Sequence, residues 1–352
     1  MNKKVKNNLK NKLKSKAKYI YDETILFIKE EYKFLICCLL ILIVFFYPVN
    51  YYIVIGGGIS NISKRIEIEN SYDNEGRFYM SYVSELIGTL GPYLLSYVIP
   101  TWERESADMY KYDVSESVED IEFRSKLDLE STNGNATYWA YKLANKECEI
   151  IDSKIYVISV FSEYNSMFKV GDILLAINDN SHDSLKDYQN YIQTLKIGDM
   201  AKIKVLRDDK EVEFETKLHG ENNRVIMGVY LQVINKYETT PEIEIKFERD
   251  ESGPSAGLIT TLAIYDKLTK GDLTKSLKIA GTGTIELDGT VGEIGGVKYK
   301  LLGAEAGDAD IFLVPSGKNY EECVKIKKEK KLKIKLIEVS TIEEAIEKLK
   351  SL

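Results

Sequence analysis

The longest uninterrupted apolar run lies near the beginning of the chain. From Phe34 to Ile55 no residue is charged, and about 20 apolar residues are enough to cross a bilayer. Three tyrosines towards the end of the run suit a membrane–water interface. The pattern predicts a single transmembrane anchor over residues 34–55.

A basic segment precedes this run. The first eighteen residues contain eight lysines and no acidic residue, and basic residues favour the cytoplasmic side of a membrane. Residues 1–33 are therefore expected to form a basic cytoplasmic tail, either an amphipathic helix on an anionic surface or a solvated segment. This predicts a cell-membrane protein whose remaining domains are extracytoplasmic. A cleavable signal peptide is the competing interpretation.

Alternating polar and apolar residues predict a hairpin over residues 62–83, with a polar turn that ends in Asn74-Glu75-Gly76. An apolar segment up to Ile99 then predicts a helix that ends at Pro100. Residues 103–135 are polar and acidic with little periodicity, which is typical of a linker. A short helix is expected over residues 138–146.

The second half of the chain shows two patterns. Short strand-like runs with one helical segment, residues 185–195, fill the region up to Lys217. Beyond residue 225, strands and helices alternate: residues 242–247, 258–268, 311–315, 332–339 and 342–349. Mixed elements of this kind predict an α+β fold class.

The length of 352 residues is enough for two or more domains. The net charge is −7, and no basic stripe lies outside the N-terminal segment, so no nucleic-acid partner is expected. The four cysteines show no CxxC spacing and only two histidines occur, so no metal or other cofactor is expected. No GxxxxGK[ST] motif is present, so no ATP site is expected.

A Gly-Pro-Ser-Ala-Gly turn places Ser255 between a predicted strand and a predicted helix. Such a turn can present a nucleophile beside the backbone amides of a helix start. No histidine lies between Arg224 and Leu352, so a serine nucleophile there needs another base. A lysine can serve if burial lowers its pKa by about 3–5 units from about 10.4. Lys298 follows a glycine pair and has apolar neighbours, which favours it.

Together these motifs resemble the proteolytic domain of the Lon family, whose fold is that of ribosomal protein S5 domain 2. The resemblance implies Ser255 as nucleophile and Lys298 as general base, with Thr282 of Gly-Thr-Gly beside the lysine. It assigns residues 225–352 to this domain, and residues 62–100 are expected to belong to the same fold. Lys300 is expected to point away from the site.

Two further residues are given supporting roles. The amide of Gly253, with that of Ser255, is expected to form an oxyanion hole, because Pro254 has no N–H. The family often carries an aspartate near its serine; if that aspartate supports the serine, its role here passes to Asp250 or is lost.

Residues 138–218 resemble a PDZ domain through a Val170-Gly171-Asp172 turn, an apolar strand and an Asn-containing turn. The usual Gly-Leu-Gly-Phe carboxylate-binding loop is not found. Addition of an extended peptide to a sheet edge is the binding mode expected here.

An anchor, a PDZ domain and a Lon-type domain without an ATPase resemble the membrane-anchored PDZ–Lon-like proteases of Gram-positive bacteria. The resemblance implies an ATP-independent serine endopeptidase that cleaves unfolded or flexible protein segments, and it allows a homo-oligomer. Two alternatives stay open: a catalytically inert peptide-binding scaffold and a serine hydrolase acting on non-peptide esters.

Overall fold

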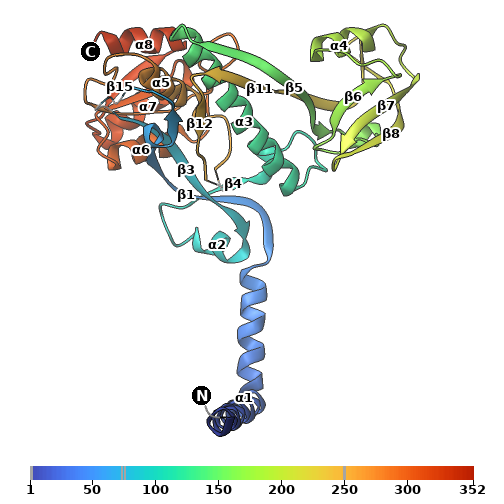
Figure 1. Ribbon diagram of the computed structural model, residues 1–352, viewed down its shortest axis with the longest axis vertical. Coiled ribbons are helices and arrows are strands. Elements are labelled where there is room, and N and C mark those ends of the chain that lie inside the picture. The colour runs from blue at the N-terminus through green and yellow to red at the C-terminus, as the bar shows by residue number, and fades with distance from the viewer. Residues whose placement is uncertain (1–2, 73, 75–76, 249–250) are drawn as a thin grey trace. The chain divides into compact units, whose positions relative to one another are not determined.

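The computed structural model describes residues 3–72, 74, 77–248 and 251–352 (Figure 1). The chain divides into two compact units. One comprises Met1–Val54 and Glu85–Ser106, and the other comprises Ile55–Ser84 and Ala107–Leu352.

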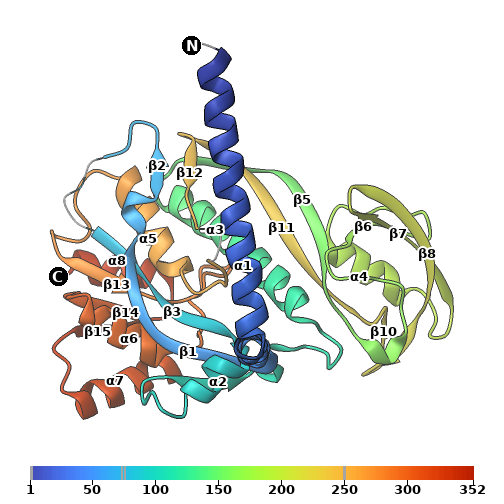
Figure 2. The ribbon, with the colours of Figure 1, turned by 90° about the horizontal axis from the view of Figure 1, so that it is seen from below.

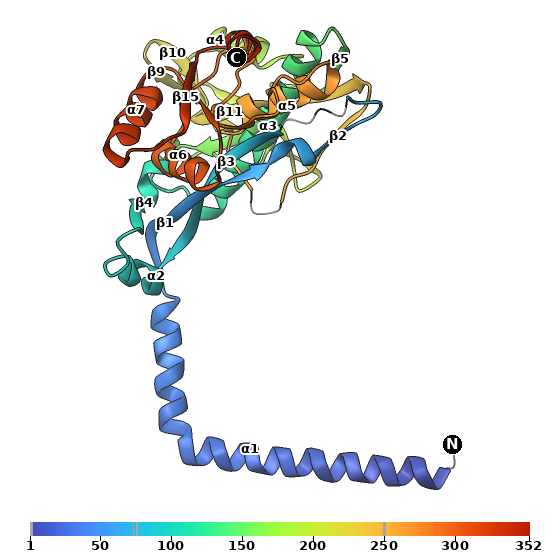
Figure 3. The same ribbon diagram turned by 90° about the vertical axis from the view of Figure 1, so that its left-hand side faces the viewer.

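The predicted transmembrane anchor is wrong. Helix α1 (Lys3–Phe45) ends well before Ile55, because the chain turns at Pro48 into strand β1 (Pro48–Asn61). Ile53 and Val54, expected in the membrane, are buried in the protein. Figure 3 shows that α1 also bends sharply. In the part of the chain that the structure describes, no helix is both long and apolar enough to span a bilayer, which overturns the predicted localisation.

The rest of the first unit is short. Only α2 (Leu90–Leu95) is helical in the segment expected to be a helix up to Pro100, because strand β3 (Arg77–Thr89) occupies its beginning. Strand β4 (Glu103–Ser106) pairs antiparallel with residues 51–54 of β1.

The second unit contains a mixed sheet with the strand order β15-β14-β13-β3-β1. Strands β13 (Lys278–Gly281), β14 (Ile311–Pro315) and β15 (Lys335–Val339) run parallel to one another, and β13 also pairs parallel with β3. Residues 77–84 therefore lie in the same sheet as the C-terminal strands. The predicted hairpin differs, because β2 (Ile66–Ile68) pairs with β12 (Ile243–Ile245) and not with β3.

Helices cover both faces of this sheet. Helices α5 (Gly257–Leu268) and α8 (Ile342–Lys350) pack in one core with Ile279, Ile311 and Leu313. Helices α6 (Val297–Ala306) and α7 (Lys318–Lys330) pack in another core with Ala280, Phe312 and Val314. Successive residues of a strand point to opposite faces, so the continuous apolar runs of β13 and β14 serve both cores.

Helix α3 (Val118–Leu143) replaces most of the predicted linker. Ser117 and Asp120 form a capping box at its start, which satisfies backbone amides that would otherwise lack partners. Trp139, Ala140 and Tyr141 bury its C-terminal part in the core that contains α5. Residues 118–135 of the expected linker are therefore helical.

The PDZ sheet has the order β11-β5-β6-β7-β8, and α4 (Leu185–Gln193) packs its buried Tyr188 and Ile192 into the same core. Its strands are β5 (Glu147–Val160), β6 (Ile173–Ile177), β7 (Met200–Arg207), β8 (Lys210–Lys217) and β11 (Val229–Thr240); a small hairpin of β9 (His219–Glu221) and β10 (Arg224–Ile226) precedes β11. The predicted boundary at residue 225 therefore shifts, because β11 pairs with β5.

The PDZ sheet is inserted between α3 and β12. Strands β5 and β11 continue beyond it as a paired ribbon that ends where Glu147 pairs with Thr240 (Figure 2). The entry and exit of the insertion thus lie side by side.

Cys148 and Cys323 are free thiols. Burial raises the pKa of Cys148 to about 11 and that of Cys323 to about 12, so both stay protonated at neutral pH.

The position of α6 depends on glycine. A Cβ atom on Gly303 would lie 2.5 Å from the backbone nitrogen of Gly58 in β1. We expect Gly303→Ala to push α6 away from β1 and to lower the free energy of unfolding by about 1–3 kcal/mol. Gly295→Ala, whose Cβ would meet nothing within 4 Å, is the matched control. Equal denaturation midpoints for the two variants would contradict this account.

Candidate active site

Ser255 lies in the turn that leads into α5. Gly253 begins the turn with a φ of 85°, a conformation that favours glycine. The backbone carbonyl of Ser255 accepts hydrogen bonds from the Gly283 amide at 2.8 Å and from the Thr282 hydroxyl at 3.0 Å. The turn is therefore held against the carboxyl end of β13, an edge where α/β proteins commonly place their sites.

A base in direct contact with this serine is Lys300. Its Nζ lies 2.6 Å from Ser255 Oγ and 3.2 Å from Thr282 Oγ1. Lys300 is only 4% exposed although it carries an amine. A lysine is rarely buried to this degree, and here it reaches a serine hydroxyl on the other side of the sheet.

The expected pairing of Ser255 with Lys298 is not what the structure contains. Lys298 is partly exposed, and its Nζ lies 5.2 Å from the ring centroid of Tyr299. Residues two positions apart on a helix differ by about 200° in direction, so only one of the two lysines can face the serine. That residue is Lys300, which was expected to point away.

A signal for this assignment was present in the sequence. Val297, Leu301 and Ala304 are buried on one face of α6, and position 300 lies three residues after the first and four before the last. Residues at these spacings share a helix face. Lys300 is therefore the lysine on the apolar stripe.

Thr282 occupies the expected place. It directly follows β13, is fully buried, and its hydroxyl accepts from Lys300 Nζ while it donates to the Ser255 carbonyl. One hydroxyl thus links the lysine to the serine turn.

The oxyanion donor expected from Gly253 is engaged elsewhere. Its N–H donates to the carbonyl of Ser125 in α3 at 2.8 Å, so it is not available to a substrate oxygen in this arrangement. Asp250, the expected supporting carboxylate, lies outside the described residues.

Sequence reasoning missed Arg65. Its guanidinium lies 2.6 Å from both carboxylate oxygens of Glu251 and donates at 3.4 Å to Glu248. The Glu251 carboxylate also accepts from the Glu248 amide at 2.9 Å. An arginine 186 positions upstream thus braces the loop before the serine. No motif indicated this ion pair.

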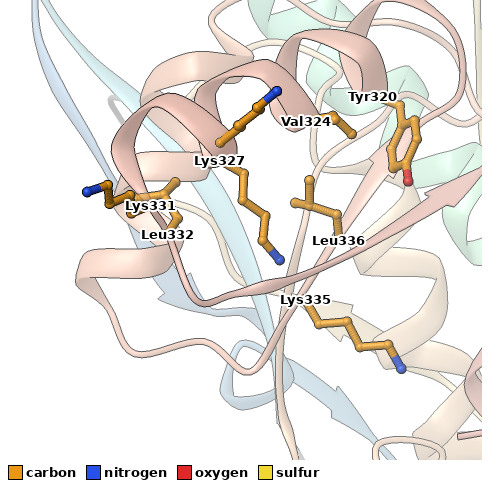
Figure 4. Close-up of a pocket in the computed structure, with 8 residues that line it drawn as sticks. Tyr320, Val324, Lys327, Lys331, Leu332, Lys335 and Leu336 are labelled. Atoms are coloured by element: carbon orange, nitrogen blue, oxygen red, sulfur yellow. The ribbon is translucent and has the colours of Figure 1, made fainter.

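A separate hollow of about 460 Å³ lies between α7 and β15 (Figure 4). It is lined by Tyr320, by three aliphatic side chains and by Lys327, Lys328, Lys331 and Lys335. It contains no serine or threonine and lies outside the Ser255–Lys300 site. Among the residues described, no group of three or more histidines, cysteines and carboxylates could hold a metal ion.

Comparison with known families matches two regions of the chain. Residues 248–351 match the Lon protease (S16) C-terminal proteolytic domain, and residues 131–218 match the PDZ domain. The chain therefore carries a PDZ domain and a proteolytic domain of the Lon serine peptidase class, as the motifs predicted.

Individual relatives are Lon proteases. That of Desulfatibacillum aliphaticivorans is 35% identical over 157 residues, which are 38% of this chain and 19% of that protein. That of Campylobacter jejuni is 29% identical over 222 residues, 56% of this chain and 26% of that protein. The chain thus spans only about a fifth to a quarter of these two relatives.

A solved PDZ domain of an SdrC-like protein from Listeria monocytogenes is 25% identical to this chain. The match covers 24% of this chain and 92% of that domain, with a TM-score of 0.22.

The ion pair between Arg65 and Glu251 allows a test of how the loop before Ser255 is held in place. We expect Arg65→Ala to lower the free energy of unfolding by about 1–2 kcal/mol, because a partly buried ion pair is lost. The same change should slow labelling of Ser255 by a fluorophosphonate, since the loop before the serine loosens. Lys111→Ala, which removes an ion pair to the exposed Asp108, is the control and should leave the labelling rate unchanged. Fast labelling in Arg65→Ala would contradict the bracing role.

Proposed function

We propose that this chain is a serine endopeptidase that works with a Ser255–Lys300 dyad. The observation that carries the proposal is the 2.6 Å contact between Lys300 Nζ and Ser255 Oγ, made by a lysine that is 4% exposed. A serine hydroxyl is a weak nucleophile until an adjacent base takes its proton. Lys300 is the base in position to do so.

The reaction follows from these positions. Ser255 Oγ attacks the peptide carbonyl carbon while its proton passes to the neutral amine of Lys300. The tetrahedral intermediate collapses when Lys300 returns the proton to the leaving nitrogen, which breaks the C–N bond and leaves an acyl group on Ser255. Water, deprotonated by Lys300, then attacks the ester carbon; the C–Oγ bond breaks, Lys300 returns the proton to Ser255 Oγ, and the second product is released.

The site favours the neutral amine that this mechanism needs. Removing an ammonium group from water disfavours its charged form, and Lys300 lies among Val297, Leu301 and Ala304. The Thr282 hydroxyl, which accepts from Nζ, directs the amine towards Ser255. Hydrogen-bond partners that fix the orientation of a base are common in such dyads and triads.

We further propose that the chain cleaves without ATP and acts on unfolded or flexible segments. The 352 residues contain no GxxxxGK[ST] motif, and a peptidase without a motor requires substrates that already expose an extended strand. The PDZ domain would capture such segments. Its strand β11 is the terminal strand of its sheet, and a sheet edge can accept an extended peptide.

The dyad is tested by cleavage of unfolded casein. We expect Ser255→Ala and Lys300→Ala each to reduce kcat by at least about a thousandfold, since each removes one half of the nucleophile–base pair. Lys298→Ala is the matched control on the same helix and should retain wild-type kcat.

The outcomes separate the alternatives. Loss of activity in Lys298→Ala with retention in Lys300→Ala would refute the assignment. Wild-type protein that binds casein without cutting it would support an inert scaffold. Cleavage of acyl esters but not of casein would support a non-peptide hydrolase.

Thr282 gives a second test of the same site. We expect Thr282→Val to lower kcat by about 10–100-fold, because the hydroxyl that joins Lys300 to the serine turn is removed while the shape is kept. Thr282→Ser keeps the hydroxyl and should restore most of the activity. If the serine variant were as slow as the valine variant, packing rather than hydrogen bonding would be the role of Thr282.

A further inference from the structure

A cleft of about 620 Å³ lies within the second unit, apart from the hollow beside α7. One helix and three strands line it. The helix α3 contributes one face through Glu130, Asn133 and Thr137, residues at spacings that share a side of a helix. The paired ribbon of β5 and β11 contributes the floor, and Ile243 and Ile245 of β12 contribute the remaining wall.

Strand β12 presents an open edge to this cleft. In the part of the chain described, it pairs only with β2. The Lys246 amide donates to the backbone carbonyl of Arg65, and the Glu69 amide donates to the backbone carbonyl of Glu242. The backbone groups of the even-numbered residues in and beside β12 therefore point towards β2. Residues of an antiparallel strand alternate in direction. The N–H and C=O groups of Ile243 and Ile245 therefore point away from β2, towards the cleft.

Helix α3 connects this cleft to the serine turn. Ser255 follows Ile245 by ten residues along the same segment. The Ser125 carbonyl, which holds the turn at Gly253, lies five residues before Glu130 on α3. Five helical residues span about 7.5 Å. The cleft and the serine turn therefore both contact α3, at positions less than two helical turns apart.

The walls suit an extended polypeptide more than a compact ligand. They combine aliphatic and aromatic side chains, among them Tyr237, with charges of both signs, among them Asp152 and Lys154. The Asn133 Oδ1 atom is buried without a hydrogen-bond partner, and Asn133 lines this cleft. Rotation of the Asn133 side chain into the cleft would let a backbone amide of an incoming strand satisfy this oxygen, since buried polar atoms usually have partners.

We propose that this cleft binds the segment of an unfolded protein substrate next to the scissile bond, as a strand added to the open edge of β12. The proposal rests on the endopeptidase function proposed above. Ile243 and Ile245 supply backbone hydrogen bonds, which recognise an extended conformation in any sequence. The ribbon that forms the floor belongs to the inserted PDZ sheet, so the insertion itself completes the binding site.

A proline at position 245 tests the edge directly in the full chain. Ile245→Pro removes an N–H that faces the cleft and leaves the bonds to β2 in place, and proline is tolerated at such edge positions. We expect KM for unfolded casein to rise about tenfold or more, from the lost bond and the ring in the path of the strand. Labelling of Ser255 by a fluorophosphonate, which needs no strand pairing, should proceed at the wild-type rate.

A second pair of variants leaves β12 untouched. Asn133→Trp places an indole in the cleft from α3 and should also raise KM for casein without slowing fluorophosphonate labelling. Glu122→Trp, at an exposed position of the same helix outside the cleft, is its control and should keep the wild-type KM.

The readouts distinguish the two proposals. Wild-type KM in both Ile245→Pro and Asn133→Trp would overturn the cleft while leaving the dyad intact. If the wild type neither cuts casein nor reacts with the fluorophosphonate, the endopeptidase function itself fails. Should Ile245→Pro unfold, as shown by its thermal midpoint, the Asn133 and Glu122 variants decide the question alone.

Discussion

The contact between Lys300 and Ser255 joins two layers of the protein that are otherwise separated by a sheet. The serine precedes α5 on one face, whereas the lysine comes from α6 on the other. They meet at the carboxyl end of β13, where Thr282 bonds to both. The 2.6 Å separation therefore depends on the sheet, on both helices and on the glycine contact between α6 and β1.

The sequence was sufficient for the domain classes. The Gly-Pro-Ser turn, the glycine pair and the Val-Gly-Asp turn are local signals, and they carried this prediction. The choice between Lys298 and Lys300 was not local, because it depends on which side of α6 faces the sheet. A count of helical spacings from Val297 to Ala304 would have favoured Lys300. Apolar neighbours in sequence were a poorer guide than apolar neighbours on the helix.

Other elements could not be read from patterns alone. The apolar run after Phe34 lacks charges, but uninterrupted hydrophobicity does not reveal where a helix ends; Pro48 and the strand pairing of β1 decide that. Residues 103–135 looked like a linker because their apolar positions are few, yet α3 buries Ile121, Arg124 and Leu127 there. The Arg65–Glu251 pair joins residues 186 positions apart, and single-sequence reasoning has no access to such a pairing.

The insertion of the PDZ sheet through a paired ribbon has a consequence for the history of this architecture. Since Glu147 and Thr240 are neighbours, the inserted residues leave and re-enter the proteolytic core at almost one point. Insertions with adjacent ends are tolerated because they impose little strain on the host fold. A tight turn joining α3 to β12 could close the same gap. Recognition modules could thus be gained, exchanged or lost at this junction while the catalytic layers kept their connections.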